Sequence, residues 1–424
     1  MRRTLNLFLL LLVFLFGCGS RAGDTSTIGL STPTPFQPAQ PASDSLYAGS
    51  APTPLAFPTT IAPTIISAES VAPTPTSIVA ATDTPVTMSG PLDPLTGLPV
   101  SDPALLNRRP LAIKVANYPR YIRPQSGLTL ADQFYEYYIE GGLTRFIAVF
   151  YGNNSDWVGP VRSGRFFDEN IQRMYQSFLV FKYADKRVLT YLQATDFAQF
   201  LVVPSIGVSS FGPCPPFELL KERKIEVYNN SYFRMTLWQP CVEKYNLPSD
   251  PPSYLSGMFD ASYKPPTSLA GNLIYTYYSV DDYNYWQYTP ETGEYVRFQE
   301  TGDTRDNHPE KYAPLIDRMT SKQVHAANVI VLFAYHAFAN DNQADDEVYH
   351  IDLTTSGEAY VFRDGMGIVA RWSRPYANQP LAFTDTATGA PIHLKPGITF
   401  YQVIGTNSYV DQGDGQWDFH HTTP

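Results

Sequence analysis

The segment from Gly19 to Gly90 restricts what this chain can fold into more than any other feature. It consists mainly of Pro, Thr, Ser and Ala, with almost no charge and no sustained period of 2 or 3.6. Such a composition buries too little apolar surface to offset the loss of chain entropy. Repeated proline favours extended chain, and a flexible segment of this length has a mean span of about 50 Å. We therefore predict a disordered tether over residues 18–90.

The N-terminus has the pattern of a bacterial lipoprotein signal. Two arginines precede an apolar run over residues 7–16. This run is too short to span a bilayer but has the length of a secretory signal core. Residues 15–18, Leu-Phe-Gly-Cys, resemble the lipobox, in which the signal is cut before a cysteine that receives diacylglycerol. The alternative is an ordinary secretory signal with an incidental cysteine.

We therefore expect a signal peptide over residues 1–17 and lipidation of Cys18. Two acyl chains are enough for stable membrane anchoring. The protein would then lie on the outer face of the cytoplasmic membrane, with the membrane itself as one partner. The net charge of -10 argues against nucleic acid as a second partner.

The residues after the tether exceed the usual size of one hydrophobic core, so more than one domain is expected. The predicted fold class is α+β, or mixed, with an N-terminal α/β domain before a mainly antiparallel β domain. The predicted parts are the N-terminal domain (91–235), a loop-rich connector (236–270), the C-terminal domain (271–410) and a flexible tail (411–424).

In the first half, a central hairpin is the main structural prediction. Residues 134–140 and 143–151 are rich in β-branched and aromatic residues, and Gly141-Gly142 separates them. A helix over 130–140 is the alternative. Helical spacing over 165–178 and 186–197 flanks a buried strand over 179–183.

Cys214 and Cys241 are the two cysteines left after the lipidation site. In an exported protein an even pair predicts a disulfide, although two free buried thiols would also be compatible with the sequence.

The 29 tyrosines have two interpretations. They lie half-buried on strands, or they form exposed surfaces that stack on sugars.

No cofactor or metal is expected. The histidines and cysteines lack metal-ligand spacing, and no nucleophile elbow, zinc-protease motif or phosphate loop is found. Two acidic loops, 341–345 and 411–415, lack the Gly and Glu positions that a calcium loop needs.

Charged and polar residues concentrate in one stretch of the first half, although only 17% of the chain is charged. These residues are the candidate ligand-binding set: Arg123, Asp132, Glu136, Glu140, Arg145, Arg162, Ser163 and Arg165. The two arginines beside Ser163 lie where a loop enters a helix, a place that suits anions. An arginine fork fits carboxylate or phosphate.

The expected hairpin pairs Glu140 with Leu143, which places Tyr138 opposite Arg145. Because side chains alternate between faces, Glu136, Glu140 and Arg145 would share one face. Arg145 could then reach either carboxylate. A helix would also place Glu136 and Glu140 on one face, at i and i+4.

Three interpretations of this set remain open. It is an ion-pair network without a ligand, a cleft for an anionic or polyol ligand, or a catalytic site. Catalysis would use Glu136 and Glu140 as the acid/base pair of a glycan-cleaving enzyme. The nearby arginines would keep both carboxylates ionised and so work against a general acid.

Several short motifs stand out in the chain: 123–128 (RPQSGL), 140–142 (EGG) and 159–163 (GPVRS), with two more at 93–99 and 362–365. These motifs resemble the YerB-type family of bacterial lipoproteins, whose core is catalogued as domain of unknown function 3048. The resemblance covers nearly all of 92–404 and implies a two-domain extracytoplasmic lipoprotein without an agreed activity. Family members tend to have a Gly/His-rich strand end after the first helix, where this chain has Lys182-Tyr-Ala-Asp-Lys186.

The sequence thus predicts a lipid-anchored envelope protein, noncatalytic, that binds a cell-wall ligand or envelope protein through an Arg/Glu cluster. The alternatives are a cell-wall glycan-cleaving enzyme and a purely structural interaction module.

Overall fold

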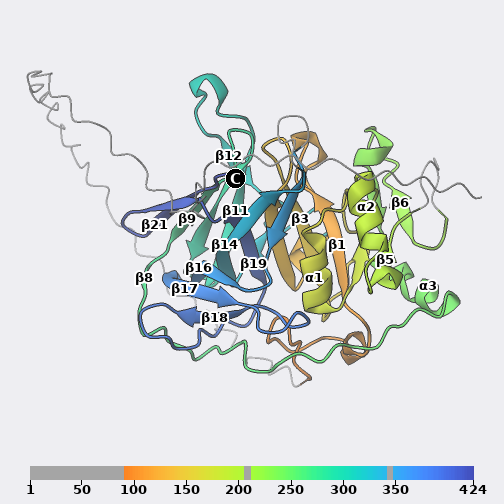
Figure 1. Cartoon of the computed structure of the whole chain (residues 1–424), viewed down its shortest axis with the longest axis horizontal. Coiled ribbons are helices and arrows are strands. Elements are labelled where there is room, and N and C mark those ends of the chain that lie inside the picture. The colour runs from red at the N-terminus through yellow and green to blue at the C-terminus, as the bar shows by residue number, and fades with distance from the viewer. Residues whose placement is uncertain (1–89, 205–211, 341–346) are drawn as a thin grey trace, which may run out of the picture. The chain divides into compact units, whose positions relative to one another are not determined.

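The computed structural model describes residues 90–204, 212–340 and 347–424, so Cys18 and nearly all of the predicted tether lie outside the described residues. The described chain is mostly β-sheet with few helices. Figure 1 shows these sheets, with α1 and α2 lying beside the β1–β3 region. No helix among the described residues is long and apolar enough to cross a membrane.

Most strands belong to two sheets. The 12-stranded sheet contains β1 (Leu111–Ala116), β2 (Gln133–Tyr138), β3 (Thr144–Phe150), β4 (Phe178–Val180), β5 (Leu201–Val202), β8 (Leu269–Ala270), β14 (Asn328–Phe338), β15 (Tyr349–Asp352), β16 (Ser356–Arg363), β17 (Met366–Ser373), β18 (Ala382–Asp385) and β19 (Thr399–Gly405). The seven-stranded sheet contains β9 (Leu273–Tyr277), β10 (Tyr283–Thr289), β11 (Glu294–Glu300), β12 (Tyr312–Pro314), β13 (His325–Ala326), β20 (Tyr409–Gln412) and β21 (Gln416–His420).

The remaining strands and the α-helices are short. They are the strand pair β6 (Phe217–Leu219) and β7 (Ser231–Phe233), and the helices α1 (Asp168–Tyr175), α2 (Lys186–Gln193) and α3 (Gln239–Lys244). The helices α1 and α2 fall within the predicted helical ranges. The predicted hairpin is formed by β2 and β3, so the helical alternative is wrong.

One continuous sheet joins the first and second halves of the chain. Strand β19 pairs in parallel with β2 on one edge and with β14 on the other. Every residue of β2 and of β19 is buried, as expected for strands in the middle of a covered sheet. The expected α/β character of the first half is limited to the parallel pairs β1–β4 and β4–β5, and a separate α/β domain is not confirmed.

Many tyrosines lie half-buried on the strands of the seven-stranded sheet. The Tyr275 ring stacks on Tyr285 with centroids 4.9 Å apart, and Tyr285 stacks on Phe298 at 4.6 Å. Tyr277 stacks on His420 at 4.7 Å. Cross-strand aromatic pairs of this kind stabilise a sheet, so these tyrosines support the structural interpretation of the tyrosine content.

The C-terminal residues are not a flexible tail, so that prediction is wrong. Strand β21 pairs in parallel with β9. Trp417 and Phe419 are 2% and 0% exposed and pack into the core. The Trp417 Nε1–H donates to the Ala270 carbonyl at 2.9 Å. The apolar and polar residues alternate over only five positions, a signal too short to stand out in the sequence.

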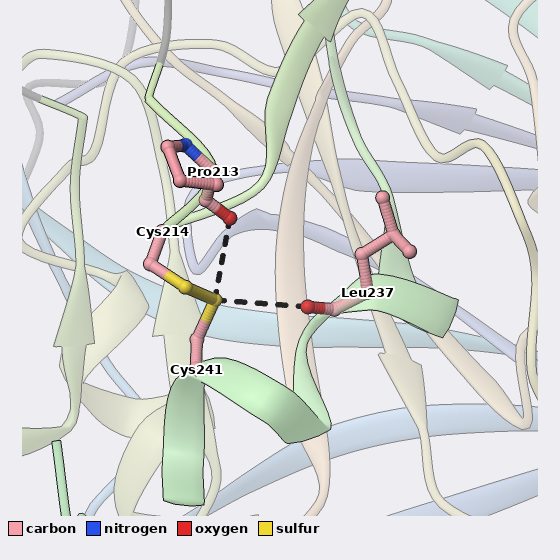
Figure 2. The surroundings of a disulfide bond; sticks show 4 residues. All are labelled: Pro213, Cys214, Leu237 and Cys241. Carbon is pink, nitrogen blue, oxygen red and sulfur yellow. Dashed lines mark hydrogen bonds between the residues drawn. A yellow bond between two sulfur atoms is a disulfide. The ribbon is translucent and has the colours of Figure 1, made fainter. Parts of the chain in front are cut away.

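Figure 2 shows the predicted disulfide between Cys214 and Cys241. It joins the loop before β6 to helix α3 across 27 residues of sequence. The carbonyl oxygens of Pro213 and Leu237 lie 3.4 and 3.6 Å from Cys241 Sγ. The bond therefore fastens a proline-rich loop to the only α-helix of the connector that the described residues contain.

Two buried carboxyl groups meet where the first described residues pack on the β2–β3 hairpin. Asp93 accepts from the Leu95 amide at 2.9 Å, and Asp132 accepts from the Gly152 amide at 3.0 Å. Both are at most 1% exposed. Burial, followed by the charge of Asp132, raises the pKa of Asp93 to about 8. Burial also raises the pKa of Asp132. The two carboxyls therefore share a proton at neutral pH.

Stability should fall as the pH rises through the folded pKa of Asp93. The folded pKa of about 8 lies above the ordinary value of 3.8, so the folded state holds a proton that the unfolded state releases. Between these two pKa values the free energy of unfolding then decreases by up to about 1.4 kcal/mol per pH unit, and it levels off above pH 8. Asp93→Asn, whose amide can replace the shared proton, should flatten this dependence in urea titrations between pH 6 and 9. Asp156→Asn is the control and should leave the slope unchanged. An unchanged slope in Asp93→Asn would contradict the shared proton.

Trp417→Ala should destabilise the fold strongly, because the indole packs against Phe362 and Tyr360. Truncating a buried tryptophan costs about 3–5 kcal/mol. The neighbouring Gln416→Ala, on the partly exposed face of β21, should change stability by no more than about 0.5 kcal/mol. Chemical denaturation of both variants measures the difference, and equal stabilities would mean that β21 does not contribute to the core.

Candidate functional site

The register of the β2–β3 hairpin differs by one residue from the expected one. Tyr137 lies opposite Arg145, and Tyr138 lies opposite Thr144. The loop has three residues, because the Ile139 amide donates to the Leu143 carbonyl at 2.8 Å. Gly141 and Gly142 in this loop have φ values of 69° and 72°, which suit glycine. A slip of one residue moves a whole strand's side chains to the opposite face, so Arg145 lies on the face opposite to Glu136.

The hairpin therefore divides the candidate residues between two places. Glu136 faces the seven-stranded sheet, together with Thr144 of β3 and Gln402 of β19. Arg145 faces the helices, on the same side as Lys114 of β1. The expected single face with Glu136, Glu140 and Arg145 does not exist.

Glu136 belongs to a buried network between the two sheets. It forms a salt bridge of 2.9 Å with Arg297 of β11, and both side chains are 0% exposed. Thr144 Oγ1 donates to Glu136 at 2.9 Å, and the Thr144 amide donates to Asp282 at 2.7 Å. Burial raises the pKa of Glu136, while the charge of Arg297 opposes this rise.

Arg123 and Asp132 also have partners within the fold. Arg123 forms a 2.6 Å salt bridge with the buried Glu300 and donates to the Asn117 carbonyl at 3.1 Å. Asp132 pairs with Asp93 and accepts from Asn153 at 2.7 Å. Arg123 and Asp132 therefore connect elements that are distant in sequence, and their observed contacts stabilise the fold.

The remaining candidates come together with residues that sequence reasoning missed. We call this set the basic cluster. Its five cations come from β1, from β3, from the loop before α1 and from the segment after β4: Lys114, Arg145, Arg162, Arg165 and Lys182. Two carboxylates, Glu140 and Asp168, accompany them. One sequence signal could have identified the two lysines of the cluster: each lies within an apolar run, 111–115 or 178–183, where a charged residue is unusual.

Glu140 is held by two arginines at the exposed edge of the cluster. Arg165 Nε donates to Glu140 at 2.8 Å, and Arg145 Nη2 lies 4.0 Å from the same carboxylate. The Glu140 side chain is 42% exposed, against 11% for Arg165. Burial would raise the pKa of Glu140, but the charge and hydrogen bonds of Arg165 bring it below its ordinary value.

Ser163 contributes its backbone carbonyl to the cluster. This oxygen accepts from Arg145 Nη1 at 3.1 Å and from Arg165 Nη1 at 3.2 Å. Asp168 begins α1 and accepts from the Arg165 amide at 2.8 Å. It also pairs with the fully buried Lys114 at 2.8 Å. Burial lowers the pKa of Lys114 to about 7, although Asp168 opposes this.

Arg162 is held by neutral groups. Its Nη1 donates to Asn229 Oδ1 at 2.6 Å and to the Tyr228 carbonyl at 3.2 Å. Among the described residues it forms no salt bridge within 4.0 Å. Lys182 donates to the Val227 carbonyl at 3.1 Å, and burial followed by the charge of Arg162 lowers its pKa to about 8.

Like charges therefore lie close together in this cluster. Burial lowers the pKa of Arg145 well below the usual arginine value, and the charges of Arg165 and Arg162 lower it further. Burial, followed by the charge of Arg165, also lowers the pKa of Arg162. An anion placed among these groups would reduce their repulsion. The arrangement is suited to binding an anion and, since Glu136 and Glu140 lie apart, not to paired-carboxylate chemistry.

Comparisons with known proteins place the chain in a family. Residues 95–237 match "Protein of unknown function (DUF3048) N-terminal domain", and residues 274–401 match the corresponding C-terminal domain. The chain is 27% identical over 327 residues to "Putative lipoprotein YerB" of Bacillus subtilis (strain 168), covering 73% of this chain and 85% of that protein. The crystal structure of the YerB protein from Bacillus subtilis shares the fold, with a TM-score of 0.57 at 23% identity over 74% of this chain and 96% of that one. The chain therefore belongs to the YerB-like DUF3048 family and contains both of its domains.

Proposed function

We propose that this chain is a lipid-anchored extracytoplasmic protein whose basic cluster binds an anionic group of a cell-envelope ligand. The observation that carries the proposal is the charge excess of the cluster. Three guanidiniums, those of Arg145, Arg162 and Arg165, surround one carboxylate, Glu140, because Asp168 pairs with Lys114. Neutral acceptors hold the guanidinium of Arg162.

Arginine geometry indicates the chemistry of the anion. The guanidinium groups of Arg145, Arg162 and Arg165 present planar forks of donors, which fit the oxygens of a carboxylate or phosphate. The loop 162–165 leads into α1, whose positive end adds to the potential. Glu140, 42% exposed, lies at the edge, where an entering anion would replace it as the partner of Arg165.

The anchor rests on different support. The pattern over residues 1–18 has a short apolar run and a lipobox cysteine, and the Bacillus subtilis relative is named a putative lipoprotein. An anchored protein on the outer face of the membrane would meet the carboxylates and phosphates of envelope polymers.

The glycan-cleaving alternative has less support. Glu136 is fully buried against Arg297. Glu140 lies on the other side of the hairpin, and the charge of Arg165 lowers its pKa, which keeps it ionised. A general acid needs a protonated carboxyl near neutral pH. No observation favours this reaction over binding.

Arg162→Gln should weaken anion binding by about 10-fold, because it removes one charge of the cluster while glutamine can still donate to Asn229. Titration calorimetry of the folded region with inorganic phosphate, and separately with acetate, measures this. Arg371→Gln is the matched control, since Arg371 lies on β17 and donates to Ser356 Oγ far along the chain. Equal affinities in Arg162→Gln and the native protein, or no binding of either anion, would contradict the proposal.

Cys18→Ala should abolish incorporation of labelled fatty acid in a bacterial host and release the protein from the membrane fraction. The single thiol is the acceptor in a lipobox, and loss of both acyl chains removes the apolar anchor. Cys241→Ala is the control, because it removes a cysteine that is not preceded by a lipobox. A Cys18→Ala protein that keeps its label and sediments with membranes would refute the anchor.

A further inference from the structure

A cleft separate from the basic cluster lies between helix α1 and the β14–β15 hairpin. It has a volume of about 620 Å³, within the usual range for small-molecule sites. We name it the tyrosine cleft, after Tyr335 and Tyr191 in its walls. We propose that the tyrosine cleft is a binding site for an uncharged saccharide.

The floor of the cleft follows from strand register. Tyr335 of β14 lies opposite Asp352 of β15, and Ala337 lies opposite His350. Because side chains alternate along a strand, these four residues share one face of the hairpin. All four residues line the cleft, and Ala337 contributes the smallest side chain of the four.

The wall is one stripe of helix α1 and the turn before it. Phe166, Glu169, Asn170 and Arg173 follow the spacing i, i+3, i+4, i+7, which places them on a single face. Glu169 and Arg173 are joined by a 2.7 Å salt bridge. Arg165, next to Phe166 in the chain, points instead to Glu140, so the cleft and the basic cluster are separate sites.

The inner end of the cleft is rigid and polar. Arg374 is only 5% exposed and donates to Asn170 Oδ1 at 2.9 Å and to the Leu353 carbonyl at 3.1 Å. The Asn170 amide in turn donates to the Ile351 carbonyl at 3.0 Å. These bonds hold the helix against the hairpin, so the cavity is preformed and its polar groups are fixed in position.

Aromatic rings frame the opening. Tyr335 and Tyr191 are 62% and 41% exposed, although each carries a large apolar ring. Phe166 stacks on His350 with centroids 4.1 Å apart, and Tyr191 packs edge-on against Phe166 at 5.2 Å. The faces of exposed rings accept the C–H faces of sugars, and the tyrosine hydroxyls can form hydrogen bonds at the wet edge of the cleft.

The charge of the cleft indicates a neutral ligand. Its lining carries two carboxylates, Glu169 and Asp352, and two guanidiniums, Arg173 and Arg374. Burial also lowers the pKa of His350, so its ring is uncharged at neutral pH. Balanced donors and acceptors around aromatic rings match the alternating hydroxyls and C–H groups of a saccharide better than an anion or an apolar compound.

The test uses the native chain and three neutral trisaccharides: the β-1,4-linked trimer of N-acetylglucosamine, maltotriose and mannotriose. Saturation-transfer NMR should detect contact with sugar C–H protons for at least one of them, and calorimetry then gives its dissociation constant. Tyr335→Ala should weaken that binding by about 10-fold or more, because it removes the most exposed ring of the cleft. Tyr335→Phe, which keeps the ring, should retain most of the affinity.

Two control variants show whether saccharide binding depends on this cleft. Tyr409→Ala removes a tyrosine that is 54% exposed on β20, outside the cleft, and should bind like the native chain. Arg162→Gln should also keep its saccharide affinity, which separates this site from the basic cluster. No signal from any of the three sugars would overturn the proposal. It would also be overturned if Tyr409→Ala and Tyr335→Ala lost saccharide affinity equally. Binding of a tetraalanine peptide but of none of the sugars would likewise overturn it.

Discussion

The register of the β2–β3 hairpin decides where the charged groups of the first half lie. A three-residue loop with two left-handed glycines sets this register. With it, Glu136 points between the sheets and Arg145 points toward the helices. If the same sequence formed a loop one residue shorter, the side chains of β3 would move to the opposite face of the sheet. Arg145 would then be buried beside Arg297. The separation of a structural ion network from a candidate binding site therefore depends on this turn.

The two charged regions differ in how completely they are neutralised. Between the sheets, Glu136 meets Arg297 at 2.9 Å and Glu300 meets Arg123 at 2.6 Å, largely out of water. Breaking one such pair leaves an uncompensated buried charge, which makes these contacts structural. In the basic cluster, a backbone carbonyl and an asparagine amide hold Arg162 instead. This incomplete pairing of Arg162 is the reason that we propose the basic cluster, and not the network between the sheets, as a binding site.

The pairing of β19 with β2 also explains why candidate sites contain residues from both family domains. Because the sheet is continuous, helix α1 of the first domain can pack against the β14–β15 hairpin of the second. Arg374, beyond β17, reaches Asn170 of α1 across 204 residues of sequence. A cleft built from such distant segments keeps its shape only while both domains are folded together.

Local patterns in the sequence were enough to predict the kind of elements and much of their placement. Alternating β-branched and aromatic residues around Gly141-Gly142 predicted the hairpin. The helical spacing before Tyr175 predicted α1, and the even cysteine pair predicted the disulfide. Family membership also followed from short motifs. Each of these features depends on residues that lie close together in the chain or on the composition of the whole.

Which side chains meet was settled only when the chain folded. The loop conformation at Gly141 and Gly142 set the hairpin register, and five alternating residues formed β21 only because β9 offered a partner edge. Lys114 and Lys182 joined the basic cluster through strand neighbours that no local pattern identifies. Strand order and register arise from contacts between segments far apart in the chain. The energies of those contacts depend on both segments, so no short stretch of sequence determines them.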